Sequence, residues 1–124
     1  MKLNLNTIIL FVQDVERLKY FYTDSLNLEI VEETPSQWLL LKAGNCNIGL
    51  HKIGDQYVGK SELPFTFHSN TKLVFELDNI NDARDYLLNK KVLMQEIKTF
   101  PDYDYWLCDG EDPEGNVFQL KQRK

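Results

Sequence analysis

The sequence lacks the features that mark membrane, disulfide-rich or nucleic-acid-binding proteins. No apolar run approaches the roughly 20 residues of a membrane-spanning helix, and the first residues have no signal-peptide pattern. Its two cysteines, Cys46 and Cys108, have no CxxC spacing, which indicates reduced thiols in a cytoplasmic protein. Acidic residues (19) outnumber basic ones (14), and a net charge of −5 argues against a nucleic-acid partner.

Familiar catalytic signatures are also missing. The sequence contains no Ser-His-Asp order, no nucleophile elbow and no glycine-rich loop that would hold phosphate. What it does contain is ordinary for a globular protein, with 124 residues of which 43% are hydrophobic. This length predicts one domain that spans residues 1–124 and forms its core without covalent cross-links.

The second half of the chain repeats the pattern of the first. "TIILFVQDV" (7–15) matches "KLVFELDNI" (72–80), and each is an apolar strand that runs into a helix start, with Asp14 or Asn79 at the N-cap position. Three strand-like segments follow each predicted helix, and in the second copy they cover 92–98, 103–110 and 116–122. We therefore predict an α+β fold of two βαβββ modules, about 1–53 and 71–124, joined by a connector at 54–70.

Alternation along four predicted strands separates two faces of the sheets. One face carries large apolar residues and is expected to pack on the helices. The other face is mixed, and it is either exposed to solvent or lines a wet cavity. Its repetition on four strands favours a shared concave surface. The mixed positions are Thr7, Ile9 and Phe11; Asn47, Gly49 and His51; Lys72, Val74 and Glu76; and Val117, Gln119 and Lys121.

The end of the chain, "DPEGNVFQL" (112–120), combines a predicted turn with a predicted strand. Asp112-Pro113-Glu114-Gly115 has the residue preferences of a type I β-turn. The apolar run that follows is interrupted by the amide of Gln119. Gln119 is either a solvated edge residue or a residue that faces an internal site.

Together these segments resemble the vicinal oxygen chelate superfamily, which includes glyoxalase I, bleomycin-resistance proteins and extradiol dioxygenases. The resemblance covers nearly the whole chain and is carried by "TIILFVQDVERLKYFYTDSLNLEI", "KLVFELDNINDARDYL" and "DPEGNVFQL". It implies two βαβββ modules whose strands curl into an open, mixed sheet around a ligand site. It also implies a homodimer, because the modules of such proteins often complete their barrels against a second chain.

In metal-dependent members of that superfamily, four strand positions supply His or Glu ligands to a divalent ion. The resemblance places these positions on Thr7, Gly49, Lys72 and Gln119. None is a usual ligand, and an ammonium would repel the ion. We therefore predict that the protein has no metal and no other cofactor, that Gln119 faces the internal site, and that glyoxalase I or dioxygenase activity is disfavoured.

Further candidates lie around these positions. His51 shares the mixed face with Gly49, and Glu76 is a candidate general base if it is buried. The segment "TFPDYDYW" (99–106) alternates acids and rings, which suits a flat or cationic organic ligand. The predicted floor of the site contains Thr7, Gly49, His51, Lys72, Glu76 and Gln119, and its walls contain Trp38, Tyr103, Tyr105 and Trp106.

Three functions fit these observations. The first is a metal-independent protein that binds a small organic molecule, similar to bleomycin-resistance proteins that confer antibiotic resistance by sequestering a drug or toxic compound. The second is a lyase or isomerase of the glyoxalase family that uses a displaced metal site or a general base such as Glu76. The third is a dimerisation module without a ligand. In each, the chain is expected to act without nucleic acid or membrane.

Overall fold

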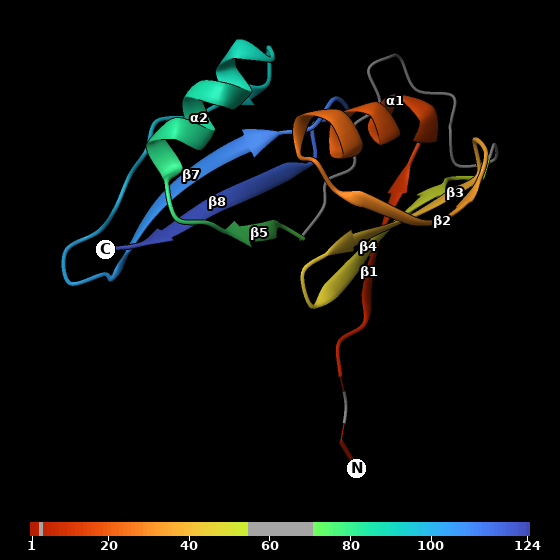
Figure 1. Cartoon of the computed structure of the whole chain (residues 1–124), viewed down its shortest axis with the longest axis horizontal. Coiled ribbons are helices and arrows are strands. Elements are labelled where there is room, and N and C mark those ends of the chain that lie inside the picture. Colours follow the sequence, from red (N-terminus) through yellow and green to blue (C-terminus); the bar gives the residue numbers. More distant parts are fainter. Residues whose placement is uncertain (3, 55–70) are drawn as a thin grey trace. The chain divides into compact units, whose positions relative to one another are not determined.

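The computed structural model describes residues 1–2, 4–54 and 71–124 (Figure 1). The chain divides into two units, Met1–Phe65 and Thr66–Lys124. All but residue 54 of the predicted connector lies outside the described residues. No helix in the described ranges is long and apolar enough to cross a membrane. That the two units together form one domain stays a prediction.

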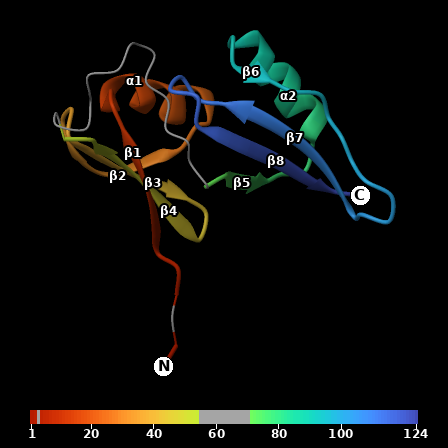
Figure 2. The same cartoon turned by 180° about the vertical axis from the view of Figure 1, so that it is seen from behind.

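The first unit follows the predicted βαβββ order. Its elements are β1 (Thr7–Val12), α1 (Val15–Tyr20), the π-helical turn η1 (Phe21–Ser25), β2 (Glu29–Thr34), β3 (Trp38–Ala43) and β4 (Cys46–Lys52). The strands form a sheet in the order β1-β4-β3-β2, in which only β1 and β4 are parallel. In both views, α1 lies across one face of this sheet (Figures 1 and 2).

The second unit repeats this arrangement with β5 (Leu73–Glu76), α2 (Ile80–Asn89), β6 (Leu93–Met94), β7 (Tyr105–Glu111) and β8 (Val117–Arg123). Its sheet has the equivalent order β5-β8-β7-β6, again with one parallel pair. The predicted α+β fold of two βαβββ modules with open mixed sheets is therefore confirmed. The strand predicted over 92–98 is much shorter: β6 ends at Met94, beyond which the Gln95 N–H donates to the Asp109 carbonyl oxygen and an isolated bridge joins Lys98 to Leu107.

Both predicted helix caps are present. The Asp14 side chain accepts a hydrogen bond from the Arg17 backbone N–H, and the Asn79 side chain accepts one from the Asp82 N–H. Each cap satisfies a backbone donor that the first helical turn would leave without a partner. The two copies thus begin their helices with the same chemistry at matching positions.

The helix-facing side of each sheet forms the core of its unit. Burial of such a side chain contributes about 1.5–3 kcal/mol to folding. Residues buried to 3% exposure or less include Val12, Leu18, Tyr22, Leu39, Leu41 and Leu50 in the first unit, and Ile80, Leu87, Cys108 and Phe118 in the second. The opposite sides of the strands are more exposed, with residues such as Phe11 and Val74 open to solvent.

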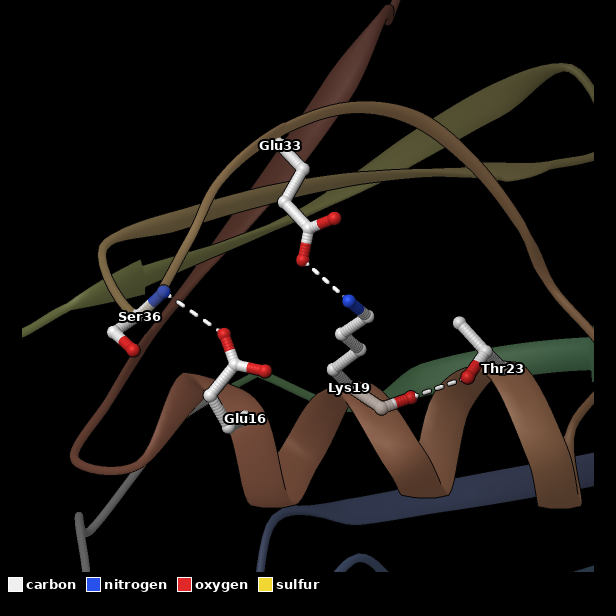
Figure 3. A network of polar contacts seen from close by, with 5 residues as sticks. All are labelled: Glu16, Lys19, Thr23, Glu33 and Ser36. Atoms are coloured by element: carbon white, nitrogen blue, oxygen red, sulfur yellow. Dashed lines mark hydrogen bonds and ion pairs between the residues drawn. The ribbon is translucent and has the colours of Figure 1, made fainter.

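Polar contacts fasten the β2–β3 hairpin to α1 in the first unit (Figure 3). The Lys19 ammonium donates to the Glu33 carboxylate at 2.6 Å, and the Ser36 backbone N–H donates to the Glu16 carboxylate at 2.9 Å. Every residue of β2 is exposed, so apolar packing does little to hold this edge strand. The two hydrogen bonds therefore hold the hairpin against α1 where apolar side chains of β2 do not.

Candidate functional site

The open face of the first unit carries a row of rings. Phe11, His51 and Trp38 lie side by side on three neighbouring strands. The ring centroids of Phe11 and His51 are 5.7 Å apart, and those of Trp38 and His51 are 6.0 Å apart. We call these three residues the aromatic row. The next row along the strands is aliphatic and contains Ile9, Gly49 and Leu40.

Gly49 leaves space that the ring of Trp38 occupies. A Cβ atom at position 49 would collide with the tip of the Trp38 ring and would lie 3.3 Å from the Ile9 side chain. The indole N–H of Trp38 donates to the Glu32 carboxylate at 2.8 Å. Because Glu32 pairs with Leu40 across the hairpin, its side chain belongs to the open face, whereas the next residue, Glu33, points to α1. The face therefore places the Glu32 carboxylate beside its rings.

The other predicted residues of this unit lie on the same face. Thr7 is two residues before Ile9 on β1, and its hydroxyl donates to the Asn6 side chain at 2.6 Å. His51 is exposed, and its Nδ1 lies 2.8 Å from the Lys52 carbonyl oxygen. Thr7, Gly49, His51 and Trp38 thus share one side of one sheet.

The open face of the second unit is built around Asp109. Gln119 on β8 lies directly opposite Asp109 on β7 and Val74 on β5. The Gln119 amide donates to Asp109 Oδ1 at 2.8 Å, and the Lys72 ammonium donates to Asp109 Oδ2 at 3.2 Å. Phe118 is fully buried on the opposite side, so Gln119 does not pack under the helix.

These contacts and the burial of Asp109 act in opposite directions on its pKa. Burial is the largest influence on its pKa and raises it. The hydrogen bonds from Gln119 and Lys72, together with the charges of Lys72 and Lys98, outweigh burial and lower the pKa below its usual value. Asp109 is therefore ionised at neutral pH and accepts hydrogen bonds through both oxygens.

Glu76 and Tyr105 have surroundings that restrict their predicted roles. Glu76 is exposed and pairs across the sheet with Lys121, so it lacks the buried setting in which we expected a general base. The Lys121 ammonium lies 4.0 Å from the centroid of the Tyr105 ring, and the Tyr103 ring is 5.6 Å from that of Tyr105. A cation of the chain itself therefore already occupies a face of Tyr105.

Trp106 lies on the other side of β7. It alternates with Leu107 and Asp109 and shares the helix-facing side with Cys108. Its ring contacts the Lys124 ammonium, 5.0 Å from the centroid. Trp106, a predicted wall residue, therefore lies on the opposite side of the sheet from Gln119, because it is adjacent to Tyr105 and neighbouring residues of a strand point to opposite faces.

The four positions that the resemblance assigns to a metal do not fit one. Lys72 and Gln119 both present N–H donors to Asp109, and neither offers a lone pair in that direction. Gly49 has no side chain, and the Thr7 hydroxyl is a donor to Asn6. Among residues 1–2, 4–54 and 71–124, no three His, Cys, Asp or Glu side chains gather as a metal would require.

Comparison with known proteins identifies the family. The Glyoxalase/Bleomycin resistance protein/Dioxygenase superfamily matches residues 4–120. The chain belongs to this superfamily. No curated protein matches the chain closely enough to narrow the assignment within the superfamily.

Solved structures of the superfamily's fold match nearly the full chain. The antibiotic-binding protein TnmS3 from Streptomyces has a TM-score of 0.78 at 19% identity, over 99% of this chain and 98% of that one. A lactoylglutathione lyase from Agrobacterium tumefaciens has a TM-score of 0.75 at 18% identity, over 95% and 92%. A protein from the mobile metagenome of V. Pseudocholerae has a TM-score of 0.74 at 25% identity, over 100% and 98%.

Two acidic residues of the open faces escaped the sequence analysis. Asp109 was overlooked because the faces of β7 were not assigned, although the predicted turn at 112–115 sets its register against β8. Glu32 lies in a fully exposed strand with no alternation of apolar residues that would have marked its face. Apart from Trp106, the predicted site residues lie on one face in each unit, and their joining in one cavity stays a prediction.

Proposed function

We propose that the chain is a metal-independent, cytoplasmic protein that binds a small organic molecule, cationic or aromatic, and sequesters it as a drug-resistance protein does. The observation that carries this proposal is the aromatic row beside Glu32. Phe11 is 57% exposed and Ile9 is 45% exposed, so the face presents apolar surface to solvent. Exposed rings beside a carboxylate suit a flat organic cation. The fold shared with an antibiotic-binding protein supports this reading.

Metal independence rests on the chemistry of Thr7, Gly49, Lys72 and Gln119. Lys72 provides only donors and Gly49 no side chain, and Thr7 and Gln119 offer only a neutral hydroxyl and a neutral amide oxygen where such a metal prefers imidazole or carboxylate ligands. Elemental analysis of protein purified without chelator should find less than one Zn, Ni, Mn or Fe per chain. One metal ion per chain, lost in Gln119→Ala, would contradict this part of the proposal and favour the lyase or isomerase.

The binding test follows the fluorescence of Trp38 in a Trp106→Phe background, so that one indole reports. The probes are N-methylquinolinium, a flat cation, and quinoline, its uncharged counterpart near neutral pH. We expect N-methylquinolinium to quench Trp38 at lower concentration than quinoline. Glu32→Gln should weaken quinolinium binding up to about fivefold, as for a partly exposed charge pair, and leave quinoline unchanged.

A matched control is Glu29→Gln, which removes a carboxylate from the same exposed strand without touching Trp38. If it weakens quinolinium binding as much as Glu32→Gln does, the effect is one of net charge and the site assignment is wrong. If neither probe quenches Trp38 at millimolar concentration, the small-molecule function itself fails.

We also propose that the two units form one domain and that the chain assembles as a homodimer. Each sheet ends in edge strands, β1 and β2 or β5 and β6, whose outer backbone groups are able to pair with further strands. A closed two-fold assembly is the commonest kind of oligomer. Light scattering should give the mass of a dimer at roughly tens of micromolar, well above the dissociation constants of most stable dimers. The mass of a monomer there would refute the assembly.

A further inference from the structure

Lys72, Asp109 and Gln119 form a network on the open face of the second unit. Both oxygens of Asp109 accept hydrogen bonds, one from Gln119 at 2.8 Å and one from Lys72 at 3.2 Å. Gln119 lies on β8, directly opposite Asp109, and Lys72 precedes β5, the strand beyond β8, so both donors reach the carboxylate from the same side of β7. The Asp109 side chain is 19% exposed and that of Lys72 is 42% exposed, so the network borders solvent.

The ionised Asp109 determines how the Gln119 amide is turned. A carboxylate only accepts hydrogen bonds, so Gln119 must direct its NH₂ group to Asp109. Its carbonyl oxygen Oε1 consequently faces away from Asp109 and is available as an acceptor. Lys72 has three N–H donors and gives one to Asp109. The face therefore offers a donor and an acceptor beside one carboxylate.

Apolar surface surrounds this pair of polar groups. Val74 lies directly opposite Gln119 on the neighbouring strand and is 51% exposed. Val117 precedes Gln119 by two residues on the same face of β8 and is 36% exposed. Apolar surface with a few directional polar groups is the usual composition of a ligand site.

We propose that this network recognises an uncharged amide-type group, such as a carboxamide, lactam or urea, on an organic ligand. Lys72 donates to the ligand's carbonyl oxygen, Gln119 Oε1 accepts from its N–H, and Val74 and Val117 contact its apolar skeleton. The inference rests on the proposed small-molecule function and specifies a group that the ligand carries.

The charges of Lys72 and Asp109 disfavour binding of a ligand carboxylate or a ligand cation at this network. A ligand carboxylate would meet Lys72 already neutralised by Asp109, and its second oxygen would face Gln119 Oε1 without a hydrogen between them. A ligand cation would be repelled by Lys72 and would compete with it for Asp109. An amide satisfies both exposed groups without a charge.

Three probes of nearly the same shape separate these cases: benzamide, benzoate and benzamidinium. Binding is followed by NMR, through the side-chain amide signals of Gln119 and the methyl signals of Val74 and Val117. Benzamide should shift these signals at a concentration about threefold to tenfold lower than the two ions do, the range that one net hydrogen bond provides. Benzoate or benzamidinium acting at the same concentration as benzamide would overturn the proposal.

Substitutions of Lys72 and Gln119 test whether the preference for benzamide arises from this network. Lys72→Met should remove the preference for benzamide, and Gln119→Glu should shift it to benzamidinium. The matched controls Lys42→Met and Gln37→Glu change exposed residues of the first unit and should leave the preference intact. A preference that survives Lys72→Met, which removes a partly exposed side chain, would refute the proposal even if Gln119→Glu fails to fold.

Failure of this inference differs from failure of the proposed function. If N-methylquinolinium quenches Trp38 but benzamide shows no preference at Gln119, the protein binds small molecules and only the amide recognition is wrong. If none of the five probes changes any signal, the small-molecule function is wrong and the amide recognition falls with it.

Discussion

Replacing Gln119 with Glu should turn the hydrogen bond between Gln119 and Asp109 into a repulsion. The wild-type amide donates to Asp109 at 2.8 Å, whereas a carboxylate at the same position has no hydrogen to donate. The shape of the side chain is almost unchanged. The substitution therefore changes the charge and the hydrogen-bonding capacity of the side chain without changing how it packs.

The size of the effect follows from the distances. Two unit charges about 4 Å apart repel by about 4 kcal/mol at an effective dielectric constant of about 20. Protonation of one carboxyl limits the cost at about pH 7 to about 4 kcal/mol, because the ordinary Glu pKa is about 4.3 and each unit corresponds to about 1.4 kcal/mol. Lys72, 3.2 Å from Asp109, and partial solvent exposure reduce the repulsion. We expect the free energy of unfolding to fall by about 2–3 kcal/mol.

The dependence on pH provides the sharper test. In the Gln119→Glu variant, repulsion between the new carboxyl and Asp109 raises one pKa of the pair in the folded state above its value in the unfolded state. The free energy of unfolding of the variant therefore falls as pH rises from about 4 to about 7. In the wild type the pKa of Asp109 is lowered, so its contribution is present at neutral pH and is lost only as pH falls through that lowered pKa. The two proteins should therefore differ least near pH 4, within about 1 kcal/mol.

Urea unfolding at both pH values measures these differences, with Gln37→Glu as the control because Gln37 is exposed and lies in the other unit. The control should change the free energy of unfolding by less than about 0.5 kcal/mol at either pH. A loss of the same small size in Gln119→Glu, independent of pH, would show that Gln119 does not donate to Asp109.

Three further outcomes are expected. Gly49→Ala should displace the ring of Trp38, lower the free energy of unfolding by about 1–3 kcal/mol and shift Trp38 fluorescence; an unchanged spectrum would contradict the contact. Cys46 should react with a thiol reagent well before Cys108, because Cys108 is fully buried and burial raises its pKa; equal rates in the native protein would contradict this order. Asp112→Ala should lower the free energy of unfolding in urea by about 1–3 kcal/mol, because it removes a buried carboxylate that accepts three hydrogen bonds within the turn. An unchanged free energy of unfolding would contradict these hydrogen bonds.

The fold was predictable because repeat, alternation and capping all favour one architecture. Asp14 and Asn79 begin both helices as the sequence predicts. The turn at 112–115 forms, with the Gly115 N–H donating to the Asp112 carbonyl oxygen at 2.9 Å. Strand pairing between β1 and β4, far apart in sequence, follows from the architecture and not from any local signal.

The candidate site was only partly predictable. Strand alternation places Gln119 on the face away from the helix, as the structure has it, but alternation within one strand does not identify the partner, Asp109, on the next strand. Counting outward from the predicted turn pairs Glu111 with Val117 and Asp109 with Gln119, so the contact was within reach of the sequence. The ring of Trp38 over Gly49 was not, because side-chain direction at a strand end has no sequence signature.

The two sheets share the chemistry of their helix-facing sides but not of their open faces, where one presents rings and the other a charged network. Because alternate residues of each strand serve the two faces, positions that pack under the helix are interleaved with positions that face away from it. Phe11 and Val74 can vary without a change at Leu10 or Leu73 beside them. A duplicated module of this kind lets specificity diverge in each copy while the core stays the same. It also makes the chain a scaffold in which exposed open-face residues, such as Phe11 and Val74, can be randomised to select new binders.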